Sequence, residues 1–144
     1  MPPPEDEPIG LHLARVAKSV SRAFDVALAS AGGSLPVWLI LVSLKGEAHG
    51  TQRRLAGAVG IEGPTLTHHL NKMEAAGLVT RRRDPDNRRV HQVELTSEGD
   101  ALFVSLLDHV VAFDARLREG FDAGELGHLR RLLDRLAANT STEV

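Results

Sequence analysis

The sequence predicts a mainly α-helical fold with one small β-hairpin, in the order ααααββαα. Three observations support this prediction. Apolar residues recur at helical spacing over most of the 144 residues, which suffice for one domain. Only residues 78–95 instead show two β-type runs around a polar turn. The apolar content is mostly Leu, Val and Ala, with four Phe, one Trp and no Tyr, which favours packing between helices.

The N-terminal part is expected to hold a tail and two helices. Residues 1–8 are rich in proline and acidic residues, which is typical of a disordered tail. Residues 9 to about 31 carry an amphipathic pattern that ends at Gly32-Gly33. Ser34 then caps a second helix over about 35–45, with Pro36 in its first turn. That helix is apolar almost all round, so it is expected to be buried.

Two short helices and the hairpin follow. Thr51 is expected to cap the first of them, and Gly60-Ile61 forms a tight turn. Gly63-Pro64 opens the next helix, which runs to about Ala76 and is stopped by Gly77. The hairpin strands are predicted at 78–83 and 90–95.

Two longer helices complete the chain. Thr96 is expected to cap the first, and Gly120 interrupts the helical pattern. Asp122 and Glu125 have the spacing of a capping box for the last helix, which carries a stripe of leucines.

Composition excludes several classes of function. The sequence has no cysteine, so disulfides, cysteine-based zinc sites and thiolate catalysis are excluded. No apolar run approaches the roughly 18 residues that span a bilayer, and no signal peptide opens the chain, so we expect a cytoplasmic protein without a membrane partner. There is no phosphate-binding glycine loop, pair of catalytic carboxylates or nucleophile motif, so we expect neither an enzyme nor a cofactor.

The charge is distributed unevenly. The net charge is −2, yet residues 53–89 hold eight basic and four acidic residues, whereas the remainder holds nine basic and fifteen acidic ones. A basic segment in a neutral chain is typical of a surface that faces DNA. A merely solvated charged loop is the alternative that charge alone leaves open.

A short helix, a glycine turn, a second helix and a basic hairpin together predict a winged helix-turn-helix that binds double-stranded DNA. Leu66, Leu70 and Met73 form one stripe of the second helix that is expected to be buried. The residues away from this stripe carry hydrogen-bonding groups suited to base edges and phosphates. The predicted major-groove contacts are Pro64, Thr65, Thr67, His68, Asn71 and Lys72.

The hairpin is the second predicted contact, because an arginine at its tip fits the minor groove. Arg88 is the first candidate, with Asp86 orienting it. Because side chains alternate along a strand, the arginines before the turn cannot all face DNA together. The predicted wing residues are Arg81, Arg83, Asp86, Arg88 and Arg89.

A homodimer is predicted from the apolar stripes at both ends of the chain. A winged core of this size cannot cover them, and self-association about a two-fold axis would. The predicted organisation is therefore a dimerisation helix at 9–33, a DNA-binding domain at 34–95 and dimerisation helices at 96–144.

The central part of the sequence resembles the MarR family of bacterial transcriptional regulators. The resemblance is strong over about 51–100 and rests on Leu55-Ala56, Ile61, Thr65-Leu66-Thr67, Leu70, Met73-Glu74, Gly77-Leu78-Val79, Arg81, Asp84-Pro85-Asp86-Asn87-Arg88, Leu95-Thr96 and Gly99. It implies that the 64–76 helix reads the major groove, that the arginine at 88 enters the minor groove, and that the dimer binds a pseudo-palindromic operator. It also implies a repressor that a small aromatic or phenolic ligand releases. The pair His68-His69 in mid-helix departs from the family pattern, so the groove assignment is carried over but no base preference is. Gly63-Pro64 at the helix start also departs from it, which would shift the first contacts by one residue.

Three alternatives stay open. Trp38 is either a core residue or part of a ligand pocket with His12 and Arg15, by analogy with the family. His12, Asp108 and His109 would hold a metal only if the dimer brought them together, and solvated histidines are the favoured interpretation. The winged helix would alternatively bind an acidic protein partner through its basic face.

Overall fold

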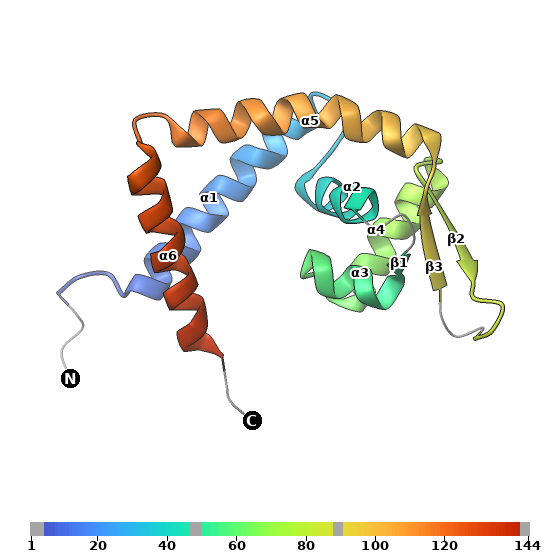
Figure 1. The fold of residues 1–144 in the computed structure, drawn as a ribbon, viewed down its shortest axis with the longest axis horizontal. Helices are drawn as coiled ribbons and strands as arrows, with labels where there is room; N and C mark the ends of the chain where they lie inside the picture. The colour runs from blue at the N-terminus through green and yellow to red at the C-terminus, as the bar shows by residue number, and fades with distance from the viewer. Residues whose placement is uncertain (1–4, 47–49, 88–90, 142–144) are drawn as a thin grey trace. The chain divides into compact units, whose positions relative to one another are not determined.

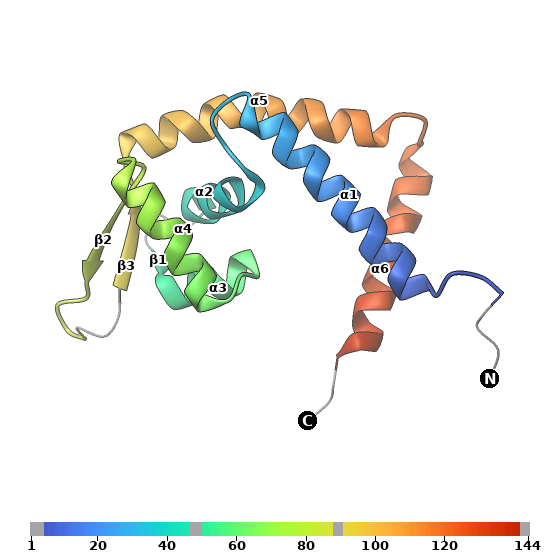
Figure 2. The same ribbon diagram turned by 180° about the vertical axis from the view of Figure 1, so that it is seen from behind.

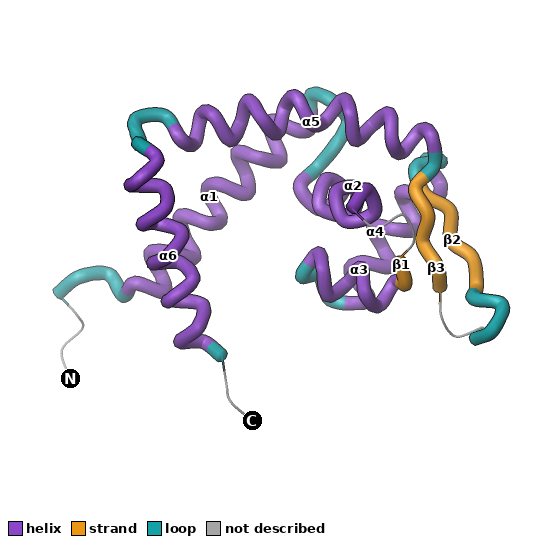
Figure 3. The backbone as a smooth tube through the Cα atoms, in the orientation of Figure 1, coloured by secondary structure: helices purple, strands orange, loops and turns teal. Residues whose placement is uncertain are grey.

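The computed structural model describes residues 5–46, 50–87 and 91–141, and within them six helices and one three-stranded sheet (Figures 1 and 3). The chain divides into two compact units, Met1–Val110 and Val111–Val144, and the division falls within the fifth helix. The predicted mainly helical fold with a hairpin is confirmed. The assignment of residues 9–33 and 96–144 to dimerisation stays a prediction.

The first two helices are α1, Ile9–Ala29, and α2, Leu35–Gly46. A hydrogen bond spans the turn between them: the Asp25 carboxylate of α1 accepts from the Leu35 backbone N–H of α2 at 2.7 Å. Ser34 caps α2 as predicted, although weakly, with its hydroxyl 3.4 Å from the Val37 backbone nitrogen. Helix α2 is the central element of the first unit and buries Trp38, Ile40, Leu41 and Leu44.

The helix-turn-helix consists of α3, Gln52–Val59, and α4, Gly63–Ala75. The Thr51 hydroxyl accepts from the Arg54 backbone N–H at 3.1 Å, which confirms the predicted cap. Gly60 ends α3 with a φ of 73°, a left-handed conformation that a side chain disfavours. This one residue turns the chain sharply enough for α4 to begin three positions later. Figure 2 shows α4, in green, beside the hairpin.

The sheet holds one strand more than the sequence predicted. Strands β2, Val79–Arg83, and β3, His91–Leu95, form the expected antiparallel hairpin. A two-residue strand β1, Gly50–Thr51, pairs with the other edge of β3, which gives the order β1-β3-β2. The predicted order of elements lacked β1 because two residues are too few to show a period.

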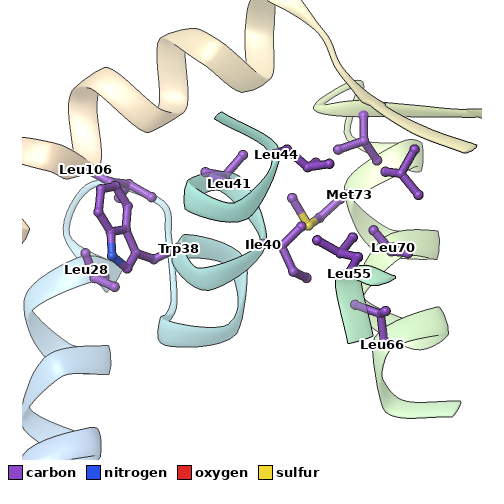
Figure 4. Packing of buried hydrophobic residues seen from close by; sticks show 12 residues of the cluster. Leu28, Trp38, Ile40, Leu41, Leu44, Leu55, Leu66, Leu70, Met73 and Leu106 are labelled. Carbon is purple, nitrogen blue, oxygen red and sulfur yellow. The ribbon is translucent and has the colours of Figure 1, made fainter. Parts of the chain in front are cut away.

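One hydrophobic core joins α2, α3, α4 and the sheet. Figure 4 shows its side chains converging from α2 onto α4 on one side, and onto Leu28 and Leu106 on the other. The fully buried members are Leu28, Ile40, Leu41, Leu66, Leu70, Met73, Val79, Val93 and Leu106. The core thus holds the helix-turn-helix and the hairpin as one body.

Helix α5, Ser97–Arg118, starts directly from β3. The Thr96 hydroxyl caps it by accepting from the Gly99 backbone N–H at 3.0 Å, as predicted. Gly99 has no room for a side chain, because a Cβ there would lie 2.2 Å from the Leu78 carbonyl oxygen. The start of α5 is therefore packed directly against the backbone at the start of the hairpin.

The second unit contains the end of α5 and the whole of α6, Ala123–Thr140. The predicted capping box is present: Asp122 and Glu125 each accept a hydrogen bond from the other's backbone N–H, at 2.8 and 3.1 Å. No residue of α6 is buried. Among the described residues, no helix has the length and apolar character needed to cross a membrane.

Candidate nucleic-acid interface

Helix α4 has one buried face and one exposed face. Leu66 and Leu70 are fully buried and Met73 is 2% exposed, so the predicted stripe anchors the helix in the core. With 100° per residue, Pro64 and His68 lie on the opposite side. Exposed side chains there are those of Pro64, Thr65, His68, Asn71 and Lys72, all predicted DNA contacts.

Thr67, the sixth predicted contact, turns toward the protein instead. Its hydroxyl donates to the Gly63 carbonyl at 3.0 Å and accepts from the Gln52 side-chain amide at 2.7 Å. The residue is half-buried. The Thr67 hydroxyl therefore links α3 to α4 through hydrogen bonds. Direct contact of Thr67 with DNA stays a prediction.

A polar cluster joins the other end of α4 to the hairpin. The Arg81 guanidinium donates to the Asn71 carbonyl oxygen at 2.5 Å and to the Glu74 carboxylate at 3.1 Å. The Arg81 backbone N–H donates to the second oxygen of Glu74 at 3.0 Å. This hydrogen bonding holds the pKa of the Glu74 carboxyl below its usual value, so the group is charged at neutral pH. Arg81, predicted to contact DNA, is 17% exposed in its side chain and braces the hairpin against α4.

In the outer part of the hairpin, acidic side chains form an ion pair and accept hydrogen bonds. Arg82 forms an ion pair with Glu94 on the neighbouring strand. Asp84 accepts from the Asp86 backbone N–H at 2.8 Å and from the Gln92 amide at 3.3 Å, and these bonds lower the pKa of its carboxyl. Arg83 and Asp86, both predicted wing residues, are exposed, and their contact with DNA stays a prediction. Arg88 and Arg89, the other predicted wing residues, lie outside the described residues.

A groove runs between the helix-turn-helix and the hairpin. Its volume is about 830 Å³, and α3, α4 and β3 all contribute to it. The lining residues are Thr51, Gln52, Arg53, Ala56, Gly63, Thr67, Asn87 and His91. The predicted site residues do not include Gln52, Arg53 or His91. Arg53 was counted in the basic segment, but nothing in the sequence places α3 opposite His91.

Two adjacent histidines occupy the middle of α4. Their ring centroids are 5.9 Å apart, with 60° between the ring planes. His68 is exposed, whereas His69 is half-buried beside the core stripe. Burial lowers the pKa of His69, and the nearby charges of His68 and Lys72 lower it further. The His69 ring is therefore neutral when α4 is folded at neutral pH, and only His68 faces outward.

The residues of the predicted ligand pocket are not brought together within one chain. Trp38 is 8% exposed and stacks on Phe103, with centroids 5.2 Å apart and planes at 5°, as a core residue would. It packs in the same cluster as Leu28 of α1. His12 lies sixteen residues before Leu28, or about 24 Å along a helix, and Arg15 is ion-paired with Glu7 at 2.8 Å.

The described residues also contain no group of three histidine, aspartate or glutamate side chains close enough to hold a metal ion. His109, one of the three candidate ligands, makes a hydrogen bond through Nδ1 to the Ser105 carbonyl at 3.1 Å. A site made from two copies of the chain remains a separate hypothesis.

Comparison with known proteins identifies the family. A model of the MarR family matches residues 34–91. A MarR-family transcriptional regulator from Rhodococcus sp. RHA1 is 30% identical, with 93% of this chain and 95% of that chain covered and a TM-score of 0.79. CouR from Rhodococcus jostii RHA1, solved with p-coumaroyl-CoA, is 28% identical, with 95% and 96% covered and a TM-score of 0.79.

A mutant of MarR from E. coli, solved with operator DNA, shares the fold at 23% identity, with 90% and 93% covered and a TM-score of 0.83. The family match spans the helix-turn-helix and most of the hairpin, and the structural matches extend over nearly the whole chain. The resemblance found in the sequence is thereby confirmed: the chain belongs to the MarR family, whose members are transcriptional regulators and not enzymes.

Proposed function

We propose that this chain binds a pseudo-palindromic DNA operator as a homodimer and represses transcription there until a small aromatic ligand releases it. Helix α4 enters the major groove, and the tip of the hairpin enters the minor groove. The observation that carries the proposal is the exposed polar face of α4, opposite the buried Leu66–Leu70–Met73 stripe and next to an arginine-bearing hairpin. The proposal also locates the protein in the cytoplasm with its DNA.

The groove beside α3 supports this orientation. A duplex that meets the exposed face of α4 would pass its sugar-phosphate backbone over the edge where Arg53 is exposed. Arginine and the backbone N–H groups at a helix start are both common phosphate contacts. The same face thus offers groups for bases and groups for phosphates.

Dimerisation is supported by apolar side chains that the chain itself leaves uncovered. Several lie on α1 and on α5, and α6 adds three leucines at helical spacing. They are Ile9, Leu11, Leu13, Val16 and Val26, then Val104, Leu107, Val111 and Leu117, then Leu129, Leu132 and Leu133. A two-fold pair would cover such faces and present two copies of α4 to major grooves about 34 Å apart.

Ligand control is supported by one relative. CouR, at 28% identity, was solved with a coumaroyl thioester, whose acyl group is phenolic. By analogy, we propose that an aromatic acid or its thioester binds this chain and favours a dimer whose two α4 helices no longer fit one operator.

The test is a gel-shift titration with DNA from upstream of the protein's own gene, in excess competitor DNA and over a range of salt concentrations. Lys72→Ala removes an exposed ammonium from α4, so it is expected to reduce the salt slope by about one per protomer. Arg88→Ala is expected to weaken binding strongly and to reduce the slope as well. The matched control is Lys45→Ala, because the Lys45 ammonium is already ion-paired with Asp100.

Wild-type affinity in both test variants would contradict the proposed contacts. Binding that disappears with competitor would leave only general attraction to polyanions. That result would favour a winged helix that binds an acidic protein.

A further inference from the structure

We propose that Arg81 is a positioning residue for base recognition: by holding the Asn71 carbonyl oxygen, it turns the Asn71 amide N–H groups toward DNA. Asn71 then prefers a keto base, guanine or thymine, over adenine. This inference rests on the proposed function and specifies the chemistry of the same surface.

The orientation of the Asn71 amide follows from its partner. A guanidinium has only donors, so the atom that faces it at 2.5 Å must be the carbonyl oxygen. The amide nitrogen therefore points away from Arg81. Asn71 is exposed and lies about 60° around the helix from His68, at the border between the outward face of α4 and its hairpin side.

Arg81 is itself held in place. Both oxygens of Glu74 are engaged, one by the Arg81 guanidinium at 3.1 Å and one by the Arg81 backbone N–H at 3.0 Å. A carboxylate that binds the backbone and the side chain of the same residue leaves that side chain little freedom. The Arg81 side chain is only 17% exposed, so water competes weakly for the guanidinium.

This arrangement changes what an asparagine can recognise. An unconstrained asparagine pairs with adenine by accepting a hydrogen bond from N6 and donating one to N7. With its oxygen held by Arg81, Asn71 presents its amide donors to the base. Guanine presents acceptors at both N7 and O6, and thymine presents one at O4. Adenine presents an acceptor at N7 alone, and its neighbouring N6 amino group meets the Asn71 amide donor to donor.

The experiment is selection of binding sites from a random duplex library by the full-length protein. The wild-type protein is expected to enrich guanine or thymine at one position of each half-site. Arg81→Met keeps most of the side-chain length but removes the guanidinium. It is expected to raise the preference for adenine at that position by about tenfold, the smaller end of what one bidentate base contact provides.

A double variant separates positioning from direct contact. In an Asn71→Ala background, Arg81→Met is expected to leave base preference unchanged, because the amide that it controls is gone. If Arg81→Met shifts the preference equally in both backgrounds, Arg81 contacts DNA itself and the inference is wrong. An unchanged preference in the single Arg81→Met variant would overturn it too.

Asn71→Asp provides a second test if Arg81→Met impairs folding. An aspartate keeps an acceptor for Arg81 and nearly the same shape, but it has no N–H to donate. Loss of the keto preference, with cytosine gained through its N4 amino group, is the expected result. Retention of the keto preference would contradict the inference alone, whereas a wild-type protein that enriches no sequence would refute the proposed function.

Discussion

Helices α4 and α6 carry similar apolar patterns but have opposite environments. In α4 the stripe of Leu66, Leu70 and Met73 is at most 2% exposed. In α6 the leucines at 129, 132 and 133 are 38–46% exposed, although their spacing is equally helical. The pattern shows that a helix has a face to bury, but it does not show whether the partner lies in the same chain. In this chain the first face is satisfied internally, and we propose that a second copy covers the other.

The largest expected effect comes from placing charge on the α6 face. Leu129→Glu with Leu133→Glu is expected to raise the dimer dissociation constant more than about 100-fold, because two carboxylates would have to be buried without partners. Analytical ultracentrifugation over a range of concentrations measures this change. Arg131→Glu is the matched control, since it changes the net charge equally but lies about 160° around α6 from Leu133. A double variant that dimerises like the wild-type protein would contradict the comparison.

The second prediction contrasts one leucine from each helix. Leu70→Ala is expected to lower the free energy of unfolding by about 3 kcal/mol, as cavity-forming substitutions in a packed core do. It should leave the dimer dissociation constant nearly unchanged. Leu129→Ala is expected to raise that constant instead. Urea unfolding of both variants gives the free energy of unfolding, and sedimentation gives the dimer dissociation constant. If the two variants changed both quantities equally, the contrast between the α4 and α6 faces would be wrong.

The smallest expected effect concerns the pH dependence of α4. The folded state lowers the pKa of His69 from its ordinary 6.5, so the unfolded chain binds more protons as the pH falls below that value. Stability from this residue is present above about pH 6.5 and is lost as the pH falls toward the folded pKa. His69→Gln is therefore expected to lose less stability than the wild-type protein between pH 7.5 and pH 5.5, measured by urea unfolding.

His128→Gln, which replaces an exposed histidine of α6, serves as the control for that experiment. It is expected to keep the wild-type pH dependence. If both variants show the same pH dependence, the burial of His69 does not contribute to the loss of stability at low pH.

Local features of the fold were predictable from the sequence because their causes are local. The caps at Thr51 and Asp122 depend on residues within three positions, and both are present in the structure. The buried stripe of α4 follows from helical spacing alone. The short strand β1 was missed, since it exists only by pairing with β3, some 42 residues later in the chain.

The candidate site was predicted less completely, because some of its contacts join residues that are distant in the sequence. That α4 has an exposed polar face could be deduced from spacing. The hydrogen bonds between Thr67 and Gln52 and between Asn71 and Arg81 could not be deduced in this way. These pairs are 15 and 10 residues apart in the sequence, and they meet only because α3 and β2 pack on α4. Asn71 and Arg81 were predicted as separate DNA contacts, whereas a hydrogen bond joins them in the structure.

The stacking of Trp38 on Phe103 has an optical consequence. The chain contains no other tryptophan and no tyrosine, so its ultraviolet emission arises from one indole. That indole is buried where α2 packs on α5, and Figure 4 shows it on the side of α2 away from α4. Its emission therefore reports on the integrity of the α2–α5 contact. Because the sequence also lacks cysteine, one engineered thiol would give a unique acceptor site for measuring distances from this natural fluorophore.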